Sequence, residues 1–234
     1  MPVRHRGLAP EDTLFFDPAR LSRMREGVCD LLWLLQRNYS PKASLELVGN
    51  RYQLNTRERL AISRAAVVCK NRQPPLPLSA LRERSVIIDG FNLLITIEVA
   101  LGGGIILKCQ DDLLRDIANI HGSYHPRIET DNAVTLICDT LMESGIKRAL
   151  FLFDRPVSNS GRIVERINRL GYEKSYPIEA KTADGVDRKL MDSKKIVLTN
   201  DSMILESGVR WSDLLTPLVH AKIPTARIVD LRCR

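Results

Sequence analysis

Long hydrophobic runs are absent from this 234-residue sequence: no apolar stretch approaches the roughly 20 residues that a membrane-spanning helix needs. Residues 1–13 also lack the apolar segment of a secretory signal. These absences favour a cytoplasmic protein with no membrane partner. Hydrophobic residues still make up 44% of the chain, enough for one sizeable core and a smaller second one. A disordered or fibrous protein is therefore excluded, and two domains are expected.

Cysteine is sparse and scattered. No two of the five cysteines form a C-x-x-C pair; they are Cys29, Cys69, Cys109, Cys138 and Cys233. This spacing favours reduced, partly buried side chains over a disulfide framework or a zinc site.

Several common catalytic motifs are also missing. The Gly-Gly-Gly run at 102–104 lacks the Gly-Lys-Ser/Thr of a phosphate-binding loop, and no G-x-S-x-G motif of a serine hydrolase occurs. His121 and His125 have the spacing of a metal site on a helix. Because Gly122 and Pro126 disfavour a helix there, we expect a surface or substrate loop instead.

Positive charge is what the chain has in excess, and it is unevenly placed. The net charge is +7; residues 1–84 hold 15 Lys and Arg against 8 Asp and Glu, whereas residues 85–234 hold 20 of each. The whole excess therefore lies in the N-terminal third, which favours an acidic polymer as partner. The alternative is a solvated basic surface.

The N-terminal third has a helical pattern. Apolar spacings of three and four predict helices over residues 18–39, 43–48 and 56–69, the last capped by Asn55 or Thr56. A helix, a glycine-containing turn and an arginine-rich helix weakly resemble a helix-turn-helix, and DNA is a possible partner on that ground. Ordinary helix packing explains the same pattern equally well. The arginines that would reach phosphates are Arg51, Arg57, Arg59 and Arg64.

The pattern changes after a proline-rich segment. Three prolines within residues 71–77 cannot continue a helix or lie inside a sheet. We therefore divide the chain into a basic helical domain at 1–72, a linker at 73–84 and an α/β domain at 85–234. Short apolar runs alternate with helical segments in the last part, which predicts a parallel sheet covered on both faces. The strand candidates are residues 85–88, 149–153, 173–176, 196–199 and 226–231.

Aspartates follow the predicted strands. Asp89, Asp154 and Asp201 come directly or closely after three of them, at the edge where an open parallel sheet binds ligands. Asp184 and Asp187 follow the third strand and would point to one side of a helix. Carboxylates that crowd together repel one another, and oxygen-only ligands favour Mg²⁺ or Mn²⁺. Each aspartate alone also fits a structural role as a helix cap or turn residue.

Four motifs carry a family resemblance. In order along the chain they read VIIDGFN, LFLFDRP, TADGVD and IVLTNDS. Together they resemble the PIN-like superfamily, especially its NYN branch, over residues 85–231. The resemblance implies a three-layer domain with the strand order 3-2-1-4-5 and a divalent-metal nuclease site. The whole chain also resembles a two-part archaeal family of unknown function.

Carried over by motif, the resemblance implies roles for individual residues. Asp89, Asp154, Asp184 and Asp201 would be the main catalytic and metal-binding acids, with Asp187 beside them as a further metal ligand. Asn92 would orient the first loop, and Thr199 or Ser202 would bond a carboxylate or phosphate. Arg155 and Arg188 near this edge are candidates for holding phosphates, or are structural ion pairs. The further acid that many PIN-like domains supply is left open among Glu98, Asp111, Asp112 and Asp116.

The function expected from these features is metal-dependent hydrolysis of phosphodiester bonds, with RNA as the expected substrate. One alternative is a catalytically inactive PIN-like module that binds RNA or a protein. Another is a DNA-binding regulator that uses the N-terminal helices, with the C-terminal domain serving to form a homodimer.

Overall fold

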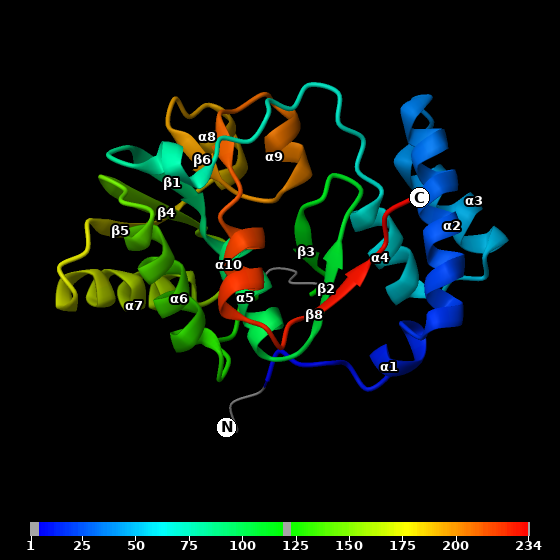
Figure 1. Ribbon diagram of the computed structural model, residues 1–234, viewed down its shortest axis with the longest axis horizontal. Helices are drawn as coiled ribbons and strands as arrows, with labels where there is room; N and C mark the ends of the chain where they lie inside the picture. The colour runs from blue at the N-terminus through cyan, green and yellow to red at the C-terminus, as the bar shows by residue number, and fades with distance from the viewer. Residues whose placement is uncertain (1–4, 119–122, 234) are drawn as a thin grey trace.

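A five-stranded parallel sheet lies at the centre of the α/β part of the chain. We describe it from a computed structural model, over residues 5–118 and 123–233 (Figure 1). The strands pair in the order β5-β4-β1-β6-β7, with every neighbouring pair parallel. Numbered along the chain this is 3-2-1-4-5, so the predicted order is confirmed. The strands are β1 (Ser85–Asp89), β4 (Arg148–Asp154), β5 (Ile178–Ala183), β6 (Ile196–Leu198) and β7 (Trp211–Ser212).

Helices cover both faces of this sheet, because successive residues of each strand point to opposite faces. In β1, Val86 and Ile88 belong to one buried cluster and Ile87 belongs to another. The first cluster includes α5 (Gly90–Leu101), α6 (Thr130–Glu143), α7 (Ser160–Glu173) and α10 (Leu215–Lys222). The second includes α8 (Val186–Met191) and α9 (Ser202–Glu206). This gives the three layers expected from the sequence.

Two strand predictions were wrong in position. Residues 173–176 contain the end of α7, and the third strand begins only at Ile178. This is an edge strand with Lys181 exposed on its solvent face, so it does not look like an apolar run. The predicted last strand at 226–231 exists as β8 (Arg227–Asp230), but it does not join the main sheet. The fifth position is taken by β7, whose two residues are too few to give a periodic signal.

A second, three-stranded sheet lies beside α5. Its order is β3-β2-β8, built from β2 (Ile105–Lys108), β3 (Leu114–Asp116) and β8. The β2–β3 pair is antiparallel and the β2–β8 pair is parallel. The sequence pattern did not predict β2 or β3, which follow the glycine run at 102–104.

The three predicted N-terminal helices form with adjusted ends, and a short helix that was not predicted precedes them. They are α1 (Asp12–Phe15), α2 (Pro18–Gln36), α3 (Pro41–Arg51) and α4 (Thr56–Ala65), and a short helix η1 (Leu78–Leu81) follows the prolines. Asn55 caps α4: its side chain accepts from the backbone N–H groups of Arg57 and Glu58, and Glu58 accepts in return from the Asn55 N–H at 2.8 Å. This reciprocal capping box explains why α4 starts where it does.

The N-terminal helices share a core with the small sheet. Val28 of α2 and Ile62 of α4 are buried in one cluster with Ile105, Leu107 and Val229 of β2 and β8. In Figure 1, α2 and α4 accordingly stand beside these strands, across the molecule from α7 and β5.

The cysteine prediction was wrong at two positions. Cys29 of α2 and Cys233 near the C-terminus form a disulfide across 204 positions of sequence, whereas Cys69, Cys109 and Cys138 are free. No local spacing reveals a pair so far apart. Of the histidines discussed above, His121 lies outside the described residues and His125 is exposed. Within residues 5–118 and 123–233, no helix is long and apolar enough to cross a membrane.

Candidate functional site

Aspartates gather at the carboxyl-terminal edge of the main sheet. Asp89 is the last residue of β1 and Asp154 the last of β4, and these strands are neighbours. Asp201 follows β6, the strand on the other side of β1, after a two-residue turn. Three adjacent parallel strands therefore deliver one acid each to the same edge of the sheet.

Asp89 lies at the centre of this group. The Thr199 hydroxyl donates to its Oδ2 at 2.9 Å, and the Asn92 N–H donates to its Oδ1 at 3.3 Å. Burial raises the pKa of Asp89 from an ordinary 3.8 to about 7, and the negative charges of Asp201 and Asp187 add to this despite the two hydrogen bonds. Asp89 consequently changes its protonation state near neutral pH.

Asp187 extends the cluster. Burial, followed by the charges of Asp201 and Asp154, raises its pKa as well. Asp89, Asp154, Asp187 and Asp201 thus act on one another electrostatically; we call them the acidic cluster. Two of them also cap helices, since Asp89 accepts from the first turn of α5 and Asp201 from the Met203 N–H at 2.8 Å in α9.

Asp184 is placed differently from the other predicted acids. Its carboxylate lies 3.3 Å from Arg155 Nη1, and its side chain is 67% exposed. Asp184 precedes α8, and Gly185 between them has a φ of +61°. The two acids of this segment therefore do not lie on one helical face, and Asp187 is the one that couples to the cluster.

The supporting residues connect the loops that carry the acids. Asn92 Oδ1 accepts from the Asn200 N–H at 2.8 Å, which joins the loop after β1 to the turn after β6. Thr199 Oγ1 donates to Asp89 and accepts from the Asp201 N–H at 3.1 Å. Ser202 is the first residue of α9 and is partly exposed. Thr199 is thus bonded directly to two members of the cluster.

The four candidates for a further acid are engaged elsewhere. Glu98 is fully buried and accepts from Arg6 Nε at 2.5 Å and from Thr130 Oγ1 at 2.5 Å. Asp112 is paired with Arg232 at 2.5 Å. Asp111 and Asp116 are bonded to other groups as well.

Asp116 is connected by hydrogen bonds to the first part of α5, next to the acidic cluster. Thr96 Oγ1 donates to Asp116 Oδ2 at 2.7 Å and is also 2.9 Å from the carbonyl oxygen of Asn92, one helical turn earlier in α5. The Ala118 N–H donates to the other oxygen of Asp116 at 2.7 Å. Asp116 is therefore bonded to α5, the helix that Asp89 caps.

Sequence reasoning missed a buried ionic network behind the turn after β6. Arg115 Nε donates to the carbonyl oxygen of Asn200 at 2.7 Å, and its two terminal nitrogens each bond Asp111 at 2.7 Å. Arg72 Nη1 contacts the same carboxylate at 2.5 Å. The network holds Asn200 between Thr199 and Asp201. Only Asp111 and Arg115 are close in sequence; Arg72 and Asn200 lie far from them, so no spacing points to the whole network.

The predicted nucleic-acid-binding arginines fall into two groups. Arg57 pairs with buried Asp12, and Arg59 donates to the Leu54 carbonyl oxygen at 2.8 Å, so both are used within the fold. Arg64 is partly buried. The exposed ones, with exposed side-chain fractions of 69%, 63% and 90%, are Arg51, Arg155 and Arg188.

Comparison with known proteins identifies the family. A family model described as "Domain of unknown function (DUF5616)" matches residues 78–216, more than half of the chain, and includes all five predicted acids. The chain belongs to the DUF5616 family. A second model, "Protein of unknown function (DUF434)", matches residues 23–73. These descriptions carry no activity, so the resemblance to PIN-like domains stays a prediction.

A relative of this DUF5616 chain supports the same grouping. The uncharacterized protein MJ0935 of Methanocaldococcus jannaschii is 31% identical over 184 residues, which is 76% of this chain and 86% of the relative. No solved structure matches the chain.

The acidic cluster of the DUF5616 domain has the donor chemistry of a hard-cation site, since all its donors are carboxylate oxygens and their charges help raise the pKa of Asp89 and Asp187. In the part of the chain that the structure describes, however, no three His, Cys, Asp or Glu side chains are already arranged around a common point. The residues therefore fit Mg²⁺ or Mn²⁺ by chemistry, and their side chains would have to turn to bind one ion together.

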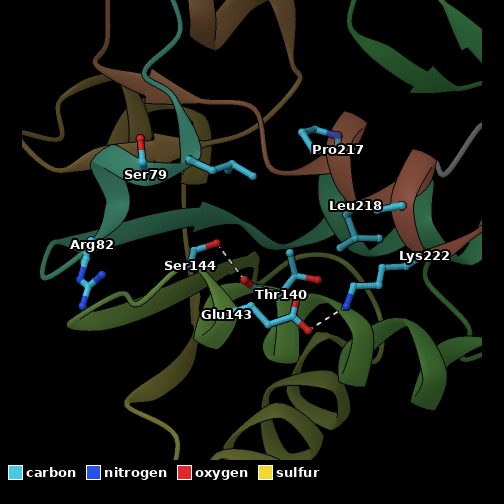
Figure 2. A pocket seen from close by; sticks show the side chains of 10 residues that line it. Ser79, Arg82, Thr140, Glu143, Ser144, Pro217, Leu218 and Lys222 are labelled. Carbon is cyan, nitrogen blue, oxygen red and sulfur yellow. Dashed lines mark hydrogen bonds and ion pairs between the residues drawn. The ribbon is translucent and has the colours of Figure 1, made fainter.

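A cavity of about 420 Å³ in the DUF5616 domain lies away from the cluster (Figure 2). Its walls come from η1 and the C-terminal ends of α6 and α10, near the start of β1 rather than its end. Several of the polar side chains that Figure 2 draws there bond to one another or to nearby backbone: Lys222 pairs with Glu143 at 2.7 Å, and Ser144 donates to the Thr140 carbonyl oxygen at 2.8 Å. We therefore place the candidate site at the acids.

The raised pKa of Asp89 predicts a pH dependence of stability. Between about pH 4 and pH 7 the folded DUF5616 domain holds a proton that the unfolded chain releases, so the free energy of unfolding falls as pH rises through this window. About three pKa units set an upper limit of about 4 kcal/mol.

Asp89→Asn should remove this slope and make the variant more stable than the unsubstituted protein at pH 8. Urea unfolding at pH 5 and pH 8, with EDTA present, measures the effect, and exposed Asp192→Asn is the control. Equal pH slopes in all three proteins would contradict the burial of a charged Asp89.

Proposed function

We propose that this protein is a divalent-metal-dependent ribonuclease that hydrolyses phosphodiester bonds at the acidic cluster. The observation that carries the proposal is the mutual electrostatic coupling of Asp89, Asp187 and Asp201 at the carboxyl edge of a parallel sheet. Folding gains nothing from repulsion between neighbouring carboxylates, and perturbed pKa values concentrate at functional sites. A cation is the simplest partner that offsets the repulsion.

The members of the acidic cluster would hold the ion. When bound, Mg²⁺ or Mn²⁺ supplies a Lewis acid that activates water and offsets negative charge on the phosphate. The protein's own contribution is orientation and proton transfer. Thr199 fixes the Asp89 carboxylate through its 2.9 Å hydrogen bond, and Asp89 can accept or release a proton near neutral pH. Arg155 and Arg188 are exposed beside the acids and can pair with phosphates flanking the scissile bond.

RNA is the proposed substrate for two reasons. The motifs that carry the acids resemble the NYN branch of PIN-like domains, and the net charge of +7 suits a polyanion. Action in the cytoplasm, as predicted from the sequence, is part of this proposal.

A module that binds RNA without cutting it is the second candidate. It is favoured by one observation: Asp89 and Asp201 already serve as helix caps, and across residues 5–118 and 123–233 no three potential ligands are set for one ion. In that case the acids would be structural and the cations would carry the binding.

The test is cleavage of end-labelled RNA, both single-stranded and hairpin, by the purified full chain in Mn²⁺, Mg²⁺ or EDTA. Cleavage with either metal and none in EDTA is expected, with 5′-phosphate and 3′-hydroxyl ends. RNA binding without cleavage in both metals would overturn the nuclease and leave the binding module. Tighter binding to duplex DNA than to RNA would favour a regulator instead.

A further inference from the structure

The α2–α3 surface carries an unusually exposed tryptophan. Trp33 is 52% exposed, whereas the other tryptophan, Trp211, is buried and donates its indole N–H to the Gln73 carbonyl oxygen at 2.7 Å. Trp33 lines a groove of about 310 Å³ between the two helices, and we call this the Trp33 groove. It is lined by Asp30, Trp33, Leu34, Leu47, Val48 and Arg51. Leu47 on its far wall is 62% exposed.

An arginine is already stacked on this tryptophan. The Arg37 guanidinium carbon lies 3.8 Å from the centre of the Trp33 ring, and Arg37 Nη1 donates to the Trp33 carbonyl oxygen at 3.1 Å. Throughout the described part of the chain, no carboxylate forms an ion pair with Arg37. Its charge thus stays available beside an open aromatic surface.

Beside the groove, Arg37 is a cation without an ion-pair partner among the described residues, whereas other arginines of the N-terminal helices are used internally. Arg20 pairs with Glu58, and Arg57 pairs with Asp12, so these cations are neutralised within the fold. At the groove, Asp30 is 3.4 Å from Arg51, and that leaves the charge of Arg37 uncompensated. An anionic ligand with flat apolar groups complements this combination better than an acidic or purely aliphatic surface does.

We propose that the Trp33 groove binds single-stranded RNA, with a base stacked on the exposed part of Trp33 and the adjoining phosphates paired with Arg37 and Arg51. The inference rests on the proposed function only in its choice of RNA. The groove is formed by α2 and α3, which in Figure 1 stand apart from β4 and α8, the elements that carry Asp154 and Asp187, so it is a surface separate from the acidic cluster. RNA held there would be retained by the chain independently of cleavage.

The first measurement is fluorescence anisotropy of a short labelled oligouridine with the full chain in EDTA, where metal-dependent cleavage cannot occur. Trp33→Ala should weaken binding roughly tenfold, because stacking on an aromatic side chain contributes strongly for each base. Trp33→Phe should retain most of the affinity. The matched control is Tyr172→Ala on α7, whose side chain is 88% exposed, and it should bind like the unsubstituted protein.

Tryptophan emission supplies a direct readout of contact. Oligouridine should quench the emission of the unsubstituted protein but not of Trp33→Phe, in which only buried Trp211 remains. Unchanged affinity in Trp33→Ala, or equal quenching in both proteins, would overturn the proposal. A Trp33→Ala protein of lower assembly mass in light scattering would also overturn it, because the groove would then be covered by a second copy of the chain. Failure of the cleavage test leaves these EDTA measurements unaffected, so the two proposals fail separately.

Discussion

Replacing Asp89 by asparagine is expected to reduce metal-dependent RNA cleavage roughly 1000-fold or more, since removing a carboxylate ligand forfeits several kcal/mol of stabilisation in the transition state. Asparagine keeps the size of the side chain: its Oδ1 can still accept from the Asn92 N–H, and its Nδ2 can donate to the Thr199 hydroxyl, the two groups that now bond separate oxygens of Asp89. The loss should therefore be chemical rather than structural. Single-turnover cleavage of end-labelled RNA at saturating Mn²⁺ measures it, with circular dichroism to verify the fold.

Asp184→Asn is the matched control. Its carboxylate is exposed and paired with Arg155, so the substitution should change the rate only a few-fold. Asp201→Asn should resemble Asp89→Asn, and the double variant should be little worse than either, because groups that act as a unit are not additive. If Asp184→Asn lost as much activity as Asp89→Asn, the acidic cluster would be wrongly assigned. Full activity in the double variant would point to a contaminating enzyme.

The contrast between Asp184 and Asp187 shows how much of the candidate site the sequence could predict. The parallel sheet and the three acids at its strand ends followed from the apolar runs, whereas the strand order was implied by the resemblance to PIN-like domains. Two acids three apart were expected on one side of a helix, but α8 starts only at Val186, after a left-handed Gly185. The helical spacing rule therefore did not apply to Asp184. A helix start that depends on the conformation of one glycine cannot be predicted from the spacing of apolar residues.

Contacts between residues far apart in the sequence were the second feature that the sequence did not predict. Cys29 and Cys233 are 204 positions apart, and Arg115 bonds a carbonyl oxygen 85 positions away. Neither pair leaves a local pattern. The edge strand β5 was missed for a different reason: Lys181 faces solvent within it, so the run is not apolar. Local sequence patterns thus predicted the carboxyl-terminal edge of the sheet and most of its acids. They did not predict the groups that hold these acids in place, because those groups pair across long stretches of sequence.

Asp111→Ala is expected to lower the free energy of unfolding by about 3–5 kcal/mol, which is the usual cost of leaving buried cations without their partner. The side chains of Asp111, Arg115 and Arg72 are 2%, 6% and 8% exposed. Burial alone would raise the pKa of Asp111, but the hydrogen bonds and charges of Arg115 and Arg72 hold it below its ordinary value. Urea unfolding at neutral pH gives the change in free energy.

The matched control for Asp111→Ala is Asp112→Ala, at the next position. Asp112 is 68% exposed and pairs with Arg232 at the surface, so its removal should cost about 1 kcal/mol or less. Because Arg115 also holds the Asn200 carbonyl oxygen, Asp111→Ala should disturb the turn that carries Thr199 and Asp201. The raised pKa of Asp89 should then shift, which the pH dependence of unfolding detects. Equal costs in the two variants would mean that the buried network does not support this turn, and that the acids are held by β1 and β6 alone.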